Sequence, residues 1–105
     1  MATSPTQLTL KKLKSEGYIT VQVTEHWNAW ARIRQDLFNI IDVLAVKDGI
    51  TIGIQVTSKA NVNARIKKIA DSEHISNLRD ANWKILVHGW YKEKNRWKLK
   101  EIDVS

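Results

Sequence analysis

The feature that most constrains the fold is a pair of apolar segments around an Asp-Gly turn. Residues 36–46 read DLFNIIDVLAV and residues 50–57 read ITIGIQVT, with Lys47, Asp48 and Gly49 between them. An Asp-Gly pair between two apolar runs is a strong short-range signal for an antiparallel hairpin. Both runs are apolar on both faces, so both faces need cover. The sequence therefore predicts a central hairpin inside a layered domain.

The flanking segments supply this cover. Ser4 followed by Pro5 is typical of a helix start, and Gly17 of a helix end, which predicts a helix over residues 5–16. Further strands are predicted over residues 18–24, 83–92 and 96–104, and helices after Asn61 and over residues 75–80. Residues 25–34, EHWNAWARIR, carry no clear pattern. The order α-β-β-β-α-β-β predicts an α/β domain with a mixed sheet of about five strands flanked by helices.

Charge narrows the class of partner. The 105 residues, which we expect to form a single domain over 1–105, carry 17 Lys and Arg against 11 Asp and Glu, for a net charge of +6. Such an excess favours polyanions, and nucleic acid fits best. The chain has no cysteine, so a metal site would have to use oxygen or imidazole ligands.

The sequence offers no membrane segment. No apolar run approaches the ~20 residues that cross a bilayer, and the first residues lack the basic-then-apolar order of a signal peptide. We therefore expect a cytoplasmic protein with no membrane partner.

Asp42 is the candidate site residue, because it interrupts the most apolar run of the chain. An unpaired carboxylate there would be costly, so a cation, a metal or hydrogen-bond donors should lie nearby. If the hairpin turns at Asp48 and Gly49, opposing residue numbers sum to about 97, which places Gln55 directly across from Asp42. Two such oxygens plus a main-chain carbonyl would suit magnesium. The alternative is that the acid and the amide only hydrogen-bond each other.

These residues resemble a known family. An N-terminal helix, an acid in one strand, a hairpin and a strand carrying Gln55-Val56-Thr57 are similar to the PD-(D/E)XK nuclease superfamily, particularly to its small archaeal and phage-encoded Holliday-junction-resolvase-like members. The resemblance covers most of the chain and implies a restriction-endonuclease-like fold. It also implies a metal site with Mg²⁺ or Mn²⁺ on Asp42, Gln55 and the carbonyl of Val56. Members often add a further acid, for which Gln7, Glu16 and Glu25 are candidates and Glu25 is preferred.

Two positions differ from the residues that are usual in the family. Thr57 occupies the place of the family's lysine, and Gln55 the place of its usual glutamate. Lys59 is the first candidate to replace the missing catalytic cation, with Arg65 and Lys68 of the following helix as alternatives. DNA contacts are expected from the same region, namely Ser58, Lys59, Arg65, Lys67 and Lys68.

The resemblance implies an enzyme, a Mg²⁺-dependent endonuclease that hydrolyses phosphodiester bonds in branched or flapped DNA during replication, recombination or repair. Relatives imply a homodimer. Because Thr57 replaces the lysine, a catalytically inactive nuclease-like DNA-binding module is the alternative. A structural subunit that binds protein through exposed tryptophans is a third reading, since the chain holds five Trp. Among these, Trp27 and Trp30 would also suit stacking on an unpaired base.

Overall fold

The central hairpin forms as predicted. In the computed structural model, which describes residues 4–105 except for the side chain of Asn28, β4 (Val43–Lys47) and β5 (Ile50–Ser58) pair antiparallel. Val43 lies opposite Ile54, so opposing numbers sum as expected. Asp48 and Gly49 both take positive φ, 51° and 79°, which is the backbone of a two-residue turn matched to the twist of its strands.

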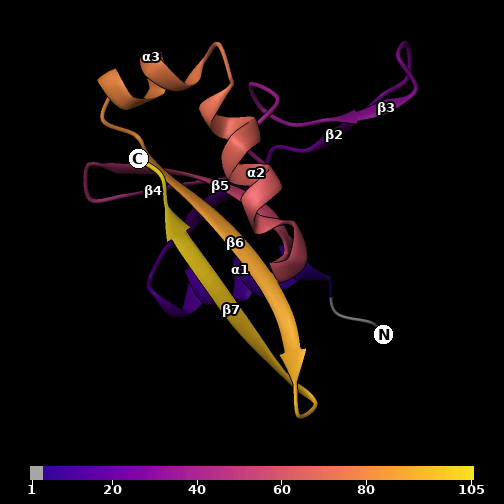
Figure 1. Cartoon of the computed structure of the whole chain (residues 1–105). Coiled ribbons are helices and arrows are strands. Elements are labelled where there is room, and N and C mark those ends of the chain that lie inside the picture. Colours follow the sequence, from indigo (N-terminus) through magenta and orange to yellow (C-terminus); the bar gives the residue numbers. More distant parts are fainter. Residues whose placement is uncertain (1–3) are drawn as a thin grey trace.

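The hairpin lies inside a mixed sheet with the strand order β1-β4-β5-β6-β7. β1 (Thr20–Val23) pairs antiparallel with β4, β6 (Lys84–Glu93) pairs parallel with β5, and β7 (Arg96–Asp103) pairs antiparallel with β6 (Figure 1). The expected α/β architecture with five strands is therefore confirmed at this level.

Helices cover both faces of the sheet. α1 (Pro5–Ser15) begins with a capping box between Ser4 and Gln7, and its Leu13 joins a core with side chains of one sheet face. η1 (Lys59–Asn61), α2 (Val62–Ala70) and α3 (Ile75–Asp80) follow β5, and α2 and α3 pack on the other face. Among residues 4–105, no helix is long and apolar enough to span a membrane.

The predicted strand over residues 36–46 is wrong in its first half. Leu37 and Ile41 bridge to each other, and the chain turns between them. Phe38 and Asn39 take positive φ, 53° and 62°, which no strand accommodates. Burial explains the apolar composition of this turn, because Ile40 and Ile41 are 2% and 0% exposed in the core beneath α2.

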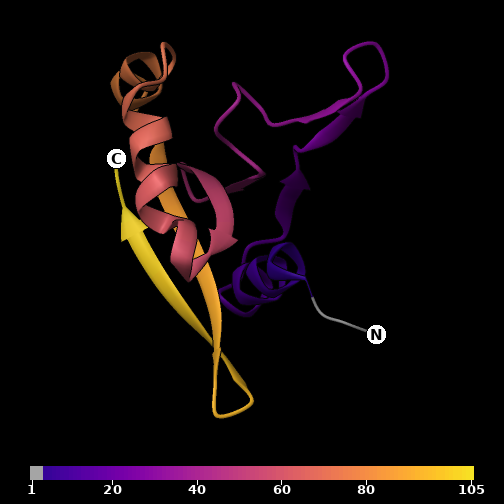
Figure 2. The ribbon, with the colours of Figure 1, turned by 45° about the vertical axis from the view of Figure 1, so that its right-hand side comes forward.

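The unassigned segment over residues 25–34 forms an arm. β2 (His26–Asn28) and β3 (Ile33–Gln35) pair as a separate two-stranded sheet. Figures 1 and 2 show this arm projecting from the body of the molecule, at the upper right of both views. The arm adds two strands to the predicted order and returns the chain toward the sheet at residue 36.

Candidate metal centre

Three carboxylates converge from separate segments of the chain. Glu25 follows β1, Asp36 follows β3, and Asp42 precedes β4. One carboxylate oxygen from each lies within 4.8 Å of the other two. Like charges so close together repel one another, so the fold must hold them there.

The position of Glu25 follows from the pairing of β1 with β4. The ladder continues one residue beyond both strands, where the Thr24 N–H donates to the Asp42 carbonyl at 2.8 Å. The Thr24 hydroxyl also donates to the carbonyl of Ile41. Glu25 is therefore fixed beside Asp42 by main-chain contacts of its neighbour.

The turn between Leu37 and Ile41 positions Asp36. The Leu37 N–H donates to the Ile41 carbonyl at 2.9 Å, and the Ile41 N–H donates back at 3.0 Å. This small loop brings Asp36 alongside Asp42, although six positions separate them. Lys68 of α2 forms an ion pair with Asp36, and its Nζ lies 3.5 Å from Asp36 Oδ2.

Gln55 and Asp42 meet as the hairpin register predicts. Gln55 Nε2 donates to Asp42 Oδ2 at 2.6 Å, and the Val56 N–H donates to the same oxygen at 2.8 Å. The two side chains are 2% and 5% exposed. Within residues 4–105, the other amide atom, Gln55 Oε1, is buried without a hydrogen-bond partner. A buried acceptor left unpaired costs on the order of 1–3 kcal/mol, so a donor or a cation at this oxygen would be favourable.

Burial and neighbouring acids raise the pKa of Asp42 to about 7. Desolvation is the largest cause, followed by the hydrogen bond with Asp36 and the negative charges of Asp36 and Glu25, while the Val56 N–H acts in the opposite direction. The cluster therefore resists carrying three negative charges, and a cation bound among them would relieve both effects.

These groups line a pocket of about 250 Å³. Basic side chains line the pocket together with the acids. Arg65 and Lys68 belong to α2, and Arg34 belongs to β3. The full lining comprises Glu25, Arg34, Asp36, Asp42, Gln55, Val56, Arg65 and Lys68. A lining that combines acids with cations suits a divalent cation together with an anionic group such as phosphate.

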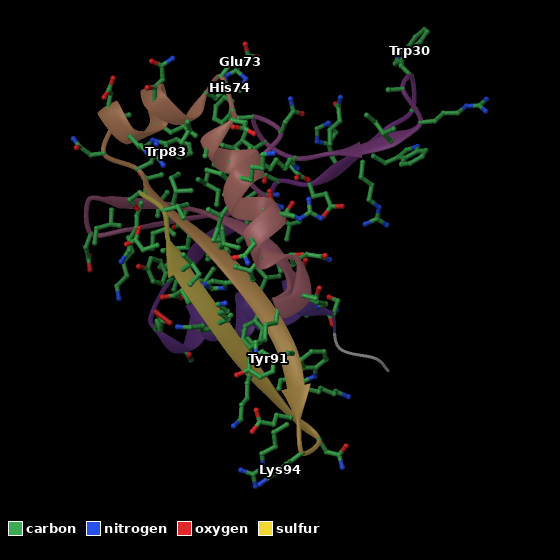
Figure 3. All side chains as sticks on the ribbon, viewed as in Figure 1. Trp30, Glu73, His74, Trp83, Tyr91 and Lys94 are labelled. Carbon is green, nitrogen blue, oxygen red and sulfur yellow. The ribbon has the colours of Figure 1, made fainter. Side chains whose placement is uncertain are left out.

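The structure does not bring Lys59 to this pocket. Its Nζ lies 4.4 Å from the centroid of the Tyr91 ring, a residue labelled on β6 in Figure 3. A cation over an aromatic face is favourable, which accounts for the orientation. Thr57, which the resemblance places at the lysine position of the nuclease family, is 8% exposed and carries no charge. The expectation that Lys59 supplies the missing cation is corrected, because Lys59 does not line the pocket, whereas the alternatives Arg65 and Lys68 do.

The other predicted residues divide into two groups. Of the three candidates for an additional acid, only Glu25 reaches the cluster, since Gln7 caps α1 and Glu16 pairs with Lys12 at the end of that helix. Val56 contacts Asp42 through its N–H, whereas the expectation concerned its carbonyl. The remaining candidates for DNA contact, Ser58 and Lys67, are exposed but do not line the pocket.

Sequence reasoning missed Asp36 and Arg34. Asp36 was assigned to the start of a strand, although Asn39 at the centre of the same run is a residue type that tolerates positive φ. Arg34 stood in the unassigned segment. The sequence of residues 25–34 carries no clear strand pattern, so it did not predict the hairpin that places Arg34 opposite Trp27.

Comparisons with protein-family models, with curated proteins and with solved structures returned no match to this chain. Function must therefore be argued from the site itself.

Proposed function

We propose that the chain is a divalent-metal-dependent DNA endonuclease, as its resemblance to the PD-(D/E)XK nucleases implies. The observation that carries the proposal is the buried Oε1 of Gln55, which has no hydrogen-bond partner among the described residues and lies beside three converging carboxylates. This all-oxygen donor set fits Mg²⁺ or Mn²⁺, and the four residues that would hold the ion are Glu25, Asp36, Asp42 and Gln55.

The bound ion would polarise a phosphoryl oxygen and lower the pKa of a coordinated water. The protein's own part is positioning. The hairpin and the Leu37–Ile41 turn hold acids that would otherwise separate, and because the pKa of Asp42 is raised to about 7, a bound cation would favour its ionised form. This coupling ties the formation of the reactive site to metal binding.

Arg65 and Lys68 supply the positive charge that Thr57 cannot. Both line the pocket from α2, and Lys68 already contacts Asp36 at 3.5 Å. A phosphate drawn into the pocket would meet these cations, which would also stabilise the charge that develops on it during hydrolysis. The net charge of +6 favours approach of the DNA backbone in general.

A second function is favoured by one specific observation. Thr57 is buried and uncharged at the position where the family carries lysine, so a nuclease-like module that binds DNA without cutting it is the competing proposal. In that case Asp42 and Gln55 would serve only to hold the hairpin together through their hydrogen bond.

Cleavage of matched duplex, flap and four-way DNA with Mg²⁺ or Mn²⁺ separates the two. We expect wild-type protein to cut flap or four-way DNA only with metal, and Asp42→Asn to bind the same DNA without cutting it. Binding without metal-dependent cutting by wild type would establish the inactive module instead. Absence of DNA binding at low salt would overturn both proposals.

A further inference from the structure

A second pocket adjoins the candidate metal centre on the arm. Its volume is about 300 Å³, and it is lined by Glu25, His26, Trp27 and Arg34. Glu25 and Arg34 also line the metal pocket, so the two spaces share a wall. The residue types differ, because the second pocket combines one carboxylate with an indole, an imidazole and a guanidinium.

The arm presents Trp27 and Arg34 together. The two are directly opposed in the pairing of β2 with β3, so their side chains project from the same face. Trp27 is 61% exposed, which is unusual for a side chain whose burial would be favourable. Its exposure keeps a large aromatic face available next to a cation.

Arg34 is held only loosely. Its Nη1 lies 3.3 Å from Glu25 Oε1, but the Arg34 side chain is 76% exposed. An exposed ion pair of this kind contributes only about 0–1 kcal/mol, so a ligand could replace it at little cost. If a cation bound Glu25 in the metal pocket, the Arg34 guanidinium would be released toward an anion.

We infer that this second pocket holds a nucleobase of an unpaired DNA strand, stacked on Trp27, with the adjoining phosphate on Arg34. An indole offers a stacking face to any base, and His26 and Glu25 offer hydrogen-bonding groups to a base edge. The net positive charge of the chain complements the negative charge of a nucleic acid. A nucleic acid also accounts for the pairing of Arg34 with an exposed indole better than an acidic or apolar protein surface does.

This inference rests on the proposed function and specifies its substrate. A base within a duplex is already stacked and paired, so placing it on Trp27 costs a few kcal/mol, whereas a base in a flap or at a branch is free to bind. Because Glu25 borders both pockets, a base seated on the arm would bring its backbone to the metal centre. The arm would therefore select unpaired nucleotides for cleavage.

Equilibrium binding in EDTA tests the base pocket without requiring catalysis. The probes are a flap DNA carrying 2-aminopurine in its unpaired strand and a duplex of the same sequence, titrated with wild type, Trp27→Ala, Trp27→Phe and Trp30→Ala. Trp30, labelled at the tip of the arm in Figure 3, is the matched control. The sequence alone made Trp30 a second candidate for base stacking, but it does not line the pocket, so this inference assigns it no contact with the base. Melting curves confirm that each variant is folded.

We expect Trp27→Ala to lose about 5- to 150-fold in affinity for the flap, the range for removal of one base–aromatic stack, and little for the duplex. Trp27→Phe should retain most of the affinity and the 2-aminopurine signal, and Trp30→Ala should change neither. Equal losses on flap and duplex, equal losses from both alanine variants, or Trp27-dependent binding of a protein in place of DNA would overturn the inference.

Cleavage measured in parallel keeps the two proposals apart. Metal-dependent cutting that is indifferent to Trp27→Ala, with no flap preference in EDTA, would remove the base pocket and leave the nuclease. Trp27-dependent binding of the flap with no cutting in Mg²⁺ or Mn²⁺ would retain the base pocket and remove the nuclease.

Discussion

The two faces of the sheet each bury a polar cluster, and the clusters differ in completeness. Under α1, Trp90 Nε1 donates to the Thr9 hydroxyl at 2.9 Å, that hydroxyl lies 3.0 Å from His88 Nδ1, and His88 Nε2 lies 2.8 Å from Glu101 Oε2. Under α2, Asp42 and Gln55 also bond each other, yet Gln55 Oε1 remains unpartnered among the described residues, and two further acids crowd Asp42.

This difference distinguishes a polar network that satisfies its own hydrogen bonds from the candidate metal centre. The Thr9–His88 cluster satisfies itself, because the indole N–H occupies one lone pair of the hydroxyl and leaves its proton for the imidazole, whose other nitrogen can donate to the carboxylate. The Asp42 cluster is stabilised only partly by its own groups. A missing partner that is positively charged and accepts oxygen ligands would complete it, which is the description of a divalent cation.

The largest expected effect is on catalysis. Asp42→Asn should lower metal-dependent cleavage of flap DNA by at least about 10²-fold, because it removes a negative ligand from the site, while DNA binding changes little. Single-turnover cleavage rates and equilibrium binding measure the two separately. The matched control is Asp48→Asn in the exposed hairpin turn, where positive φ suits asparagine. Equal loss of activity in both variants would contradict the assignment.

The pH dependence of stability should differ in sign between the clusters. In the folded protein the pKa of Asp42 is raised to about 7. Its contribution to the free energy of unfolding is therefore complete below its unfolded-state pKa of 3.8 and is lost as pH rises through 7. The loss should be on the order of 2 to 4 kcal/mol without metal and smaller with saturating Mg²⁺.

Burial lowers the pKa of His88. Its contribution to the free energy of unfolding is therefore present above its unfolded-state pKa of 6.5 and is lost as pH falls. Denaturant unfolding from pH 4 to 9 measures both slopes. Asp42→Asn should remove the decline with rising pH and His88→Gln the loss with falling pH. If the difference in stability between wild type and Asp42→Asn without metal did not change between pH 4 and 8, Asp42 would not be strained as described.

Thr9→Val should affect only the complete cluster. The substitution preserves shape but leaves the Trp90 N–H and His88 Nδ1 without their shared partner, at a cost of about 1–3 kcal/mol in the free energy of unfolding. Cleavage at a temperature where the variant is folded should match wild type. A loss of cleavage as large as that in Asp42→Asn would mean that the two faces are functionally coupled.

Gln55→Glu should lower the stability of the metal-free protein and raise its affinity for Mg²⁺. The new carboxylate would face Asp42 in place of an amide donor, so stability without metal should fall. Mg²⁺ affinity should rise by about tenfold, since ligand charge tunes affinity for hard cations. Calorimetric titration measures the affinity, and Gln22→Glu on the edge strand β1 is the control. Unchanged affinity would place the ion elsewhere.

The sequence predicted those parts of the site that local rules determine. The turn at Asp48 and Gly49 fixes the hairpin register, and the register brings Gln55 to Asp42. The start of α1 at Ser4 and Pro5 could also be predicted, because helix capping depends on a few neighbouring residues.

What the sequence could not predict depends on tertiary packing. Asp36 reaches the cluster because the chain turns at Phe38 and Asn39, which both adopt positive φ. Asn39 tolerates this backbone but Phe38 does so rarely, and the turn buries Ile40 and Ile41 in the core. Lys59 was placed in the site from its spacing alone, but a long side chain follows its best contact, and that contact is Tyr91. The resemblance to a nuclease family remains a prediction.

The central claim is that the pocket between Glu25, Asp36, Asp42 and Gln55 holds a divalent cation. Anomalous X-ray scattering from crystals grown with Mn²⁺ tests it most directly, because the signal locates the ion. The account predicts a peak about 2.0–2.2 Å from an Asp42 oxygen, with Gln55 Oε1 in the same coordination shell, and its loss in Asp42→Asn. A pocket filled only by water or by the Lys68 ammonium, with Mn²⁺ absent or bound elsewhere, would contradict it.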